Sequence, residues 1–199
     1  QKRDLLWAPL AGAAGNLVVV GGPQSGKSTL LRGLVCSLAL THTPSEVQFY
    51  GLDFGGGTLS ALEELPHVGG MAGRRDREAV LRTISELTTL MDNREKIFAQ
   101  HRIDSMATFR NRRRTETLED RPFGDIFLVV DGWGVLRQEY EQLEEPITTL
   151  ASRGLGFGIH VVLSANRWME VRPALRDTLG TRFELRLGDP GDAGVRCPL

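Results

Sequence analysis

Residues 21–29 read Gly21-Gly22-Pro23-Gln24-Ser25-Gly26-Lys27-Ser28-Thr29, and this stretch decides the fold that the sequence predicts. The four residues before it, Leu17-Val18-Val19-Val20, are an apolar run typical of a buried strand. After it, leucines recur at helical spacing. A strand, a glycine-rich loop and an amphipathic helix in this order are the context in which the pattern G-x-x-x-x-G-K-S forms a P-loop. The stretch therefore predicts a nucleoside triphosphate site, and we expect the ligand to be ATP.

Each residue type in this loop has a chemical reason. Glycines allow backbone N–H groups to turn inward around a phosphate. Lys27 brings a positive charge to the β- and γ-phosphates, and the Ser28 hydroxyl can ligate Mg²⁺. The helix that starts at Lys27 adds its positive dipole end. The residues that we expect to bind the nucleotide are Gly22, Pro23, Gln24, Ser25, Gly26, Lys27, Ser28 and Thr29.

A second motif, Ile126-Phe127-Leu128-Val129-Val130-Asp131, is an apolar strand that ends in an acid, the Walker B pattern. We expect Asp131 to hold the Mg²⁺ through water, opposite Ser28. In the additional-strand class of P-loop motors a glutamate commonly follows this acid, whereas this chain has Gly132. Loss of a general base typically costs about 10²–10⁴-fold in rate. The sequence predicts a site that binds nucleotide and hydrolyses it slowly, unless a neighbouring subunit helps.

Asn166 follows another apolar run, at the place where such motors keep a γ-phosphate sensor. It is a candidate sensor, and a turn-forming asparagine after a strand is the alternative. Asp53 lies at the end of an apolar run, where α/β sheets bind ligands, or else forms a structural turn with the glycines after it. Four arginines could reach across a subunit interface, and the sequence does not choose among Arg153, Arg167, Arg172 and Arg182. Two acids beyond the Walker B motif, Glu139 and Glu141, are expected on a solvated helix surface.

Five apolar runs predict strands at residues 17–21, 47–53, 126–131, 159–164 and 183–187. Helical periodicity predicts helices at residues 27–40, 76–101, 104–114 and 139–153, although Pro146 can interrupt the last. Residues 115–122 are polar and predict a loop. Strands that are apolar on both faces and alternate with helices indicate an α/β fold, a mostly parallel sheet flanked by helices on both faces. We expect residues 1–199 to form a single domain and, because the chain does not begin with Met, to be a fragment of a longer chain.

The composition excludes several classes of function. The net charge of -1 gives no bulk attraction to nucleic acid or anionic lipid. The basic run at residues 110–114 lacks interleaved aromatic residues, which favours a solvated helix end. Two cysteines are too few for a disulfide framework or a zinc site, and His67 and His160 are expected to be structural. No apolar run approaches the roughly 20 residues that span a bilayer.

Six segments in the same order resemble the FtsK/SpoIIIE family, and more narrowly the EccC-type ATPase domains of type VII (ESX) secretion motors. Besides the P-loop, they are residues 52–57 (LDFGGG), 65–70 (LPHVGG), 93–95 (NRE) with Phe98, 127–133 (FLVVDGW) and 158–160 (GIH). The resemblance covers nearly the whole chain. The DFGGG and DGW segments are its most specific parts, because DNA-pumping relatives tend to carry Asp-Pro-Lys and Asp-Glu at those places.

The resemblance implies a RecA-like, additional-strand ATPase core with ATP and Mg²⁺ as cofactors. It also implies a chain with three such domains, anchored to the bacterial inner membrane outside this fragment, with the ATPases on the cytoplasmic side. Its implied partners are neighbouring ATPase domains, a homo-hexamer and secreted helical-hairpin proteins of the WXG100 class, with no nucleic acid. Gly132 departs from the active pattern, so the chain is similar to a degenerate second or third domain. The alternatives are an active double-stranded DNA translocase and an interaction domain that binds no nucleotide.

Overall fold

The computed structural model describes residues 8, 10–115, 124–188 and 191. Its centre is a six-stranded parallel sheet with the strand order β3-β2-β4-β5-β1-β6. The strands are β1 (Leu17–Val20), β2 (Val47–Asp53), β3 (Val68–Gly73), β4 (Asp125–Asp131), β5 (Ile159–Ala165) and β6 (Thr181–Glu184). Strand β5 lies between the P-loop strand β1 and the Walker B strand β4, which is the additional-strand arrangement. The predicted α/β fold class is confirmed.

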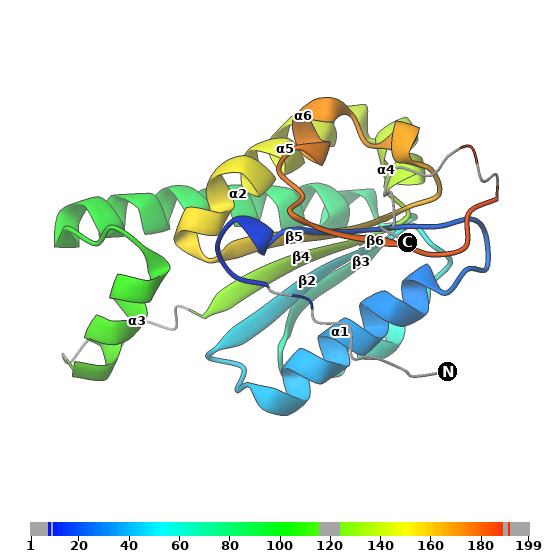
Figure 1. Ribbon diagram of the computed structural model, residues 1–199. Coiled ribbons are helices and arrows are strands. Elements are labelled where there is room, and N and C mark those ends of the chain that lie inside the picture. Colours follow the sequence, from blue (N-terminus) through cyan, green and yellow to red (C-terminus); the bar gives the residue numbers. More distant parts are fainter. Residues whose placement is uncertain (1–7, 9, 116–123, 189–190, 192–199) are drawn as a thin grey trace, which may run out of the picture.

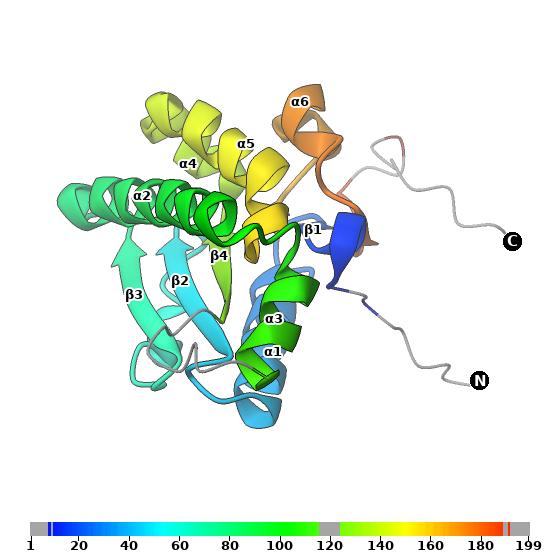
Figure 2. The same ribbon diagram turned by 90° about the vertical axis from the view of Figure 1, so that its left-hand side faces the viewer.

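Helices cover both faces of the sheet (Figures 1 and 2). Helix α1 lies on one face, and α2, α4, α5 and α6 lie on the other. Their bounds are α1 (Lys27–Thr41), α2 (Arg77–His101), α3 (Met106–Thr115), α4 (Trp133–Glu139), α5 (Glu144–Arg153) and α6 (Pro173–Arg176). Short 3-10 helices cover Gly12–Ala14 (η1), Ser60–Leu62 (η2), Glu141–Leu143 (η3), Gly154–Phe157 (η4) and Trp168–Glu170 (η5). Among the described residues, no helix is both long enough and apolar enough to cross a membrane.

The alternation of side chains along β1 shows why both faces need a cover. Val18 and Val20 belong to the core under α2 and α5, whereas Leu17 and Val19 belong to the core under α1. All four side chains are fully buried. Successive residues of a strand point to opposite faces, so an uninterrupted apolar run needs a helix layer on each side.

Strand β3 was missing from the sequence-based prediction. Three of its six residues are glycines, which weaken the β pattern because they have no side chain to pack. The strand forms nevertheless, because it pairs with β2 from Phe49 to Asp53 at the edge of the sheet. Tertiary pairing overrides the weak local preference here.

Two other boundaries were wrong. The last strand was predicted at residues 183–187 but β6 is Thr181–Glu184, although the following segment still bonds to β1 through Leu185 N and Val20 O at 2.7 Å. The helix predicted at 139–153 is divided into η3 and α5, and α4 before it was not predicted. Pro146 does not interrupt α5, because it lies in the first turn, where a helix needs no N–H donor from it.

Helix α3 begins where the sequence predicted, because the Ser105 hydroxyl accepts a hydrogen bond from Thr108 N at 3.2 Å. It packs against the end of α2 in a small apolar cluster of Phe98, Ile103, Met106 and Phe109. The loop predicted at 115–122 lies outside the described residues after Thr115.

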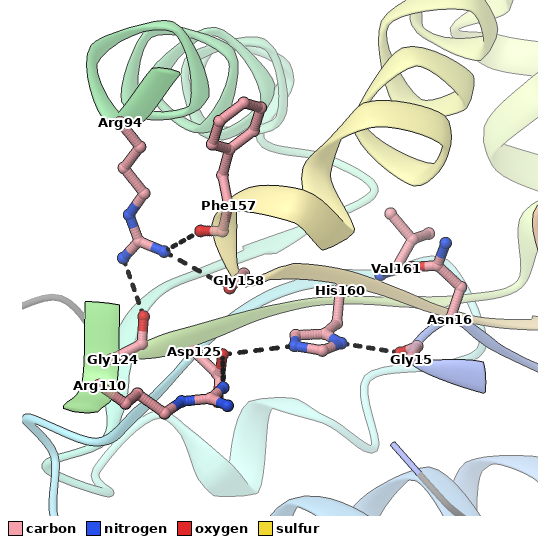
Figure 3. A network of polar contacts seen from close by, with 10 residues as sticks. All are labelled: Gly15, Asn16, Arg94, Arg110, Gly124, Asp125, Phe157, Gly158, His160 and Val161. Carbon is pink, nitrogen blue, oxygen red and sulfur yellow. Dashed lines mark hydrogen bonds and ion pairs between the residues drawn. The ribbon is translucent and has the colours of Figure 1, made fainter. Parts of the chain in front are cut away.

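Arg94 of α2 is buried at the edge of the sheet where β4 and β5 begin (Figure 3). Its guanidinium donates to the carbonyl oxygens of Phe157 at 2.6 Å and Gly124 at 2.9 Å. Burial lowers the pKa of Arg94 to about 10, and the charge of Asp125 opposes that shift. The side chain thus connects α2 to the segments that lead into β4 and β5.

A second polar chain in Figure 3 holds the residues that enter β1. His160 donates from Nδ1 to the Gly15 carbonyl at 2.9 Å, and its Nε2 lies 3.6 Å from Asp125 Oδ1. Arg110 of α3 pairs with the same carboxylate. Burial raises the pKa of Asp125, but the contacts with His160 and Arg110 lower it by more. The net pKa of Asp125 is therefore below its ordinary value. His160 therefore has a structural role in this arrangement.

Replacing Arg94 tests this edge of the sheet. We expect Arg94→Ala to lower the free energy of unfolding by about 3 kcal/mol, because two partly buried carbonyls lose charge-assisted donors and the buried Arg94 side chain leaves a cavity. Urea unfolding monitored by circular dichroism measures the change. Lys96→Ala on the exposed side of the same helix is the control. Equal effects of the two substitutions would contradict the role of Arg94.

Candidate nucleotide site

The P-loop lines a cavity of about 480 Å³ at the edge of the sheet where the strands end. Lys27 reaches back over the loop and donates from Nζ to the carbonyl oxygens of Gly21 at 2.7 Å and Gly22 at 2.8 Å. The loop contributes Pro23, Gln24, Ser25, Gly26, Lys27, Ser28 and Thr29, and the opposite wall is Phe54, Gly55, Asp131, Gly132, Val135, Ser164 and Asn166. The structure thus brings the P-loop, Asp131 and Asn166 to one cavity.

Gly22, which was predicted with the loop, is not part of this lining. It is buried, and its N–H donates to the Arg186 carbonyl at 2.8 Å. Its amide is therefore occupied by the segment after β6. Sequence reasoning had no signal for this pairing, because the segment lies more than 160 residues away along the chain.

Asp131 is buried at the end of β4, and its two oxygens have different surroundings. Oδ1 accepts a hydrogen bond from the Ser164 hydroxyl at 2.5 Å, while Oδ2 is buried without a hydrogen-bond partner among the described residues. The Ser164 hydroxyl in turn accepts from Gly132 N at 2.9 Å. Sequence reasoning missed Ser164, since it lies inside an apolar run and only its pairing with β4 shows its partner.

The residues in this cavity fit a hydrated magnesium ion. A buried carboxylate oxygen without a partner is costly, and water bound to a metal would satisfy it. The Ser28 hydroxyl lines the same cavity and supplies the oxygen chemistry that Mg²⁺ prefers. Ser28 and Asp131 are therefore the residues that would hold the ion.

Asp53 has a structural role, because its carboxylate holds the loop that follows β2. Its carboxylate accepts hydrogen bonds from three backbone N–H groups, of Gly55 at 3.1 Å, Gly57 at 3.0 Å and Leu59 at 2.7 Å. These bonds fold the glycine-rich loop back across the end of β4, where Phe54 N donates to Asp131 O at 2.8 Å. Both oxygens of Asp53 are thereby directed to its own loop and not to a ligand.

Gly132 has a backbone conformation and surroundings that disfavour a side chain. Its φ of +88° is strained for any residue with a side chain, and it caps the start of α4. A Cβ added there would lie 2.8 Å from the Phe54 carbonyl carbon and 2.9 Å from its oxygen. The space that a catalytic glutamate would need is therefore filled by the backbone of the Asp53 loop.

Asn166 lies at the rim of the cavity with an exposed side chain, and its backbone N donates to Glu170 Oε2 at 2.9 Å. Burial lowers the pKa of Lys27, whereas the charges of Asp131 and Glu170 raise it. Glu170 did not emerge from the sequence, because η5 and the turn that brings it back to Asn166 have no periodic pattern. Two carboxylates thus act electrostatically on the P-loop lysine.

The candidate arginines differ in their surroundings within the chain. Arg153 pairs with Glu95 at 2.7 Å, and Arg172 pairs with Glu144 at 3.1 Å. Arg182 donates to two backbone carbonyls at 2.9 Å. Arg167 is exposed beside Asn166.

The basic run and the two acids beyond the Walker B motif lie away from the cavity. Arg110 pairs with Asp125, and Arg112 donates to the His101 carbonyl at 2.8 Å, so both fix α3 to its neighbours. Glu139 pairs with Arg74, and Glu141 is exposed in η3.

A family model described as the FtsK/SpoIIIE family matches residues 2–197. The chain belongs to the FtsK/SpoIIIE family. This membership agrees with the order of the six strands and with the position of the P-loop between β1 and α1. Nucleotide binding with a metal ion is what this family of P-loop ATPases implies.

Within the FtsK/SpoIIIE family, the chain is similar to EccC proteins. It is 58% identical over 195 residues to the ESX secretion system protein EccC of Thermomonospora curvata, covering 98% of this chain and 15% of that protein. It is 54% identical over 193 residues to the ESX-4 secretion system protein EccC4 of Mycobacterium tuberculosis, covering 97% and 16%. A solved structure of Thermomonospora curvata EccC, with ATPases 2 and 3 and a signal sequence peptide, superposes with a TM-score of 0.93 at 58% identity, covering 97% of this chain and 35% of that chain. The chain therefore spans a minor part of the length of these relatives.

A glutamate at position 132 tests whether the missing base can be restored. We expect Gly132→Glu to lower the melting temperature and weaken ATP binding without raising turnover, because the side chain would meet the Phe54 backbone at a positive φ. Differential scanning fluorimetry and a phosphate-release assay measure both quantities. Gly33→Glu, at an exposed helical glycine with open space around it, is the control. Faster turnover with an unchanged melting temperature would show that the position tolerates the base.

Ser164→Ala tests the support of Asp131. We expect ATP affinity in the presence of Mg²⁺ to fall about tenfold, because the carboxylate loses its hydrogen-bond donor and its orientation. Affinity in EDTA should stay unchanged. Fluorescence titration with and without Mg²⁺ separates the two, and Ser152→Ala on the exposed side of α5 is the control. Equal losses in both conditions would contradict a role at the metal.

Proposed function

We propose that this chain is an ATP–Mg²⁺-binding ATPase domain that hydrolyses its nucleotide slowly or not at all. The observation that carries the proposal is Gly132, where the position of a catalytic side chain is filled by the Phe54 backbone, next to an intact P-loop and Asp131. Binding and hydrolysis depend on different parts of the site. The residues that bind nucleotide are present, whereas the glutamate that usually activates water for hydrolysis is absent.

Lys27 would exchange the carbonyl oxygens of Gly21 and Gly22 for the phosphates of the nucleotide. A bound Mg²⁺ would neutralise phosphate charge, with Ser28 and Asp131 as its protein partners. Ser164 would keep the Asp131 carboxylate turned toward the ion. Asn166, which lines the rim of the cavity, would contact the γ-phosphate as a sensor.

We further propose that the domain serves a type VII (ESX) secretion motor, in which it regulates or assembles a ring that exports small helical-hairpin proteins of the WXG100 class. The EccC relatives are named as ESX secretion proteins, and one solved relative contains two ATPases and a signal sequence peptide. Neighbouring ATPase domains and a homo-hexamer are the partners that fit such a motor. The site would then lie on the cytoplasmic side of the bacterial inner membrane, with the anchor elsewhere in the protein.

Calorimetric titration of the purified protein with ATP–Mg²⁺ tests the proposed function. We expect saturable binding and a turnover far below that of active P-loop motors. Lys27→Ala should weaken binding by a factor on the order of 100, because the phosphates lose a charge-assisted donor. Lys96→Ala, at an exposed site on α2, is the matched control.

Two results would contradict the proposal. Rapid turnover stimulated by double-stranded DNA would favour the translocase alternative, whose DNA binding should weaken steeply with salt. The absence of ATP binding would favour an interaction domain without nucleotide.

A further inference from the structure

The backbone around Asn166 is held at the rim of the nucleotide cavity from two sides. The residue before it, Ala165, ends β5, and its carbonyl oxygen accepts a hydrogen bond from Gly21 N at 3.1 Å. Asn166 N donates to Oε2 of Glu170, the last residue of η5, at 2.9 Å. This backbone is therefore fixed to the start of the P-loop on one side and to a carboxylate on the other.

Glu170 is itself attached to α4, the helix that begins directly after Gly132. Its backbone carbonyl accepts hydrogen bonds from the Trp133 indole at 3.1 Å and from Arg137 at 2.6 Å. Trp133 is fully buried, so this attachment point belongs to the core. Glu170 thus connects Asn166 to the helix that follows the Walker B strand.

The carboxylate of Glu170 can occupy its place only because Gly134 has no side chain. A Cβ added to Gly134 would lie 2.7 Å from Oε2 and 3.2 Å from Oε1 of Glu170. Oε2 is the oxygen that accepts the hydrogen bond from Asn166 N. Glycine is less favourable than alanine inside a helix such as α4, so packing against this acid is the physical reason for a glycine here.

The lining of the nucleotide cavity contains Asn166 together with Lys27, Ser28 and Asp131, whereas Glu170 is not part of it. The side-chain amide of an asparagine donates hydrogen bonds, which phosphate oxygens accept. Because ADP lacks the γ-phosphate, a contact from Asn166 to that group would strengthen the binding of ATP and not that of ADP.

We propose that Glu170 is a positioning residue that holds Asn166 for contact with the γ-phosphate, and that it thereby lets the domain distinguish ATP from ADP. This inference rests on the proposed function. Glu170 acts through its hydrogen bond with Asn166 N and touches no phosphate itself. Loss of that acceptor should therefore have the same consequence as loss of the Asn166 side chain.

An effect of the Glu170 charge can be separated from an effect of this hydrogen bond. Burial lowers the pKa of Lys27, and the charges of Asp131 and Glu170 oppose that shift. Lys27 serves the β-phosphate as well as the γ-phosphate, so a change in this charge would act on ATP and ADP together. Glu170→Gln removes the charge but keeps an oxygen that can accept from Asn166 N.

Fluorescence titrations with ATP and with ADP, both in the presence of Mg²⁺, test the inference. We expect Glu170→Ala to lower the ratio of ATP affinity to ADP affinity about tenfold, as for the loss of one hydrogen bond to a charged group. Asn166→Ala should lower the ratio equally, and the double variant should lower it no further. Glu170→Gln should keep the wild-type ratio. Glu141→Ala, at an exposed acid in η3, is the control.

Gly134→Ala is a second test, which leaves the acid in the chain but displaces its carboxylate. The affinity ratio should fall as in Glu170→Ala, although alanine favours the helix more than glycine does. Gly33→Ala, at an exposed glycine of α1 with open space around it, is the matched control.

Other results would overturn the inference. Equal losses of ATP and ADP affinity in Glu170→Ala, or an unchanged ratio, would make Glu170 a structural support alone. A further fall of the ratio in the double variant would show that Glu170 does not act through Asn166. An unchanged ratio in Asn166→Ala would remove the γ-phosphate contact and leave the proposed function standing. The absence of ATP binding in the wild type would overturn both proposals.

Discussion

The buried carboxylate of Asp131 is the interaction on which the candidate site depends. It ends the central strand β4 and is held between the Ser164 hydroxyl of β5 and the backbone of Gly55 after β2. A side chain at position 55 would meet Oδ2 at 2.3 Å, so the loop after β2 can cross there only as glycine. Because three adjacent strands meet at this carboxylate, its orientation follows from the sheet and not from an exposed loop.

The packing around Asp131 also explains why the usual base is absent. The loop after β2 is folded over β4 by the three hydrogen bonds to Asp53. Its Phe54 carbonyl then occupies the space beside Gly132. The DFGGG segment and Gly132 therefore pack directly against each other, with the Phe54 backbone next to the Gly132 Cα. A change at position 132 alone would create a clash, because the loop that opposes it would remain in place.

The sequence predicted the elements whose signals are local. The P-loop, the helix after it and the apolar strand ending in Asp131 each have a pattern within about ten residues, and all were placed as predicted. Strand β3 was missed because its glycines carry no pattern and its pairing with β2 supplies the stability. Ser164 and Glu170 were missed because their partners, Asp131 and Asn166, become apparent only when β4 and β5 lie side by side or the η5 turn closes. Periodicity describes the burial of a residue and not its hydrogen-bond partner.

At the opposite end of the sheet, where β1, β4 and β5 begin, buried polar side chains form a second set of hydrogen bonds. Asn16 at the entry to β1 is fully buried, donates to Ala151 O at 2.7 Å and Thr178 O at 3.1 Å, and accepts from Val161 N at 2.8 Å. Beside it, His160 holds Gly15, and Asp125 connects His160 to α3. Strand β1 is thus fixed at its start by side chains, whereas its end opens into the P-loop. Strand β5 contacts the segment before β1 through Val161 and His160, and it contacts Asp131 through Ser164. The strand between the P-loop and Walker B strands is therefore the physical connection from the chain entry to Asp131.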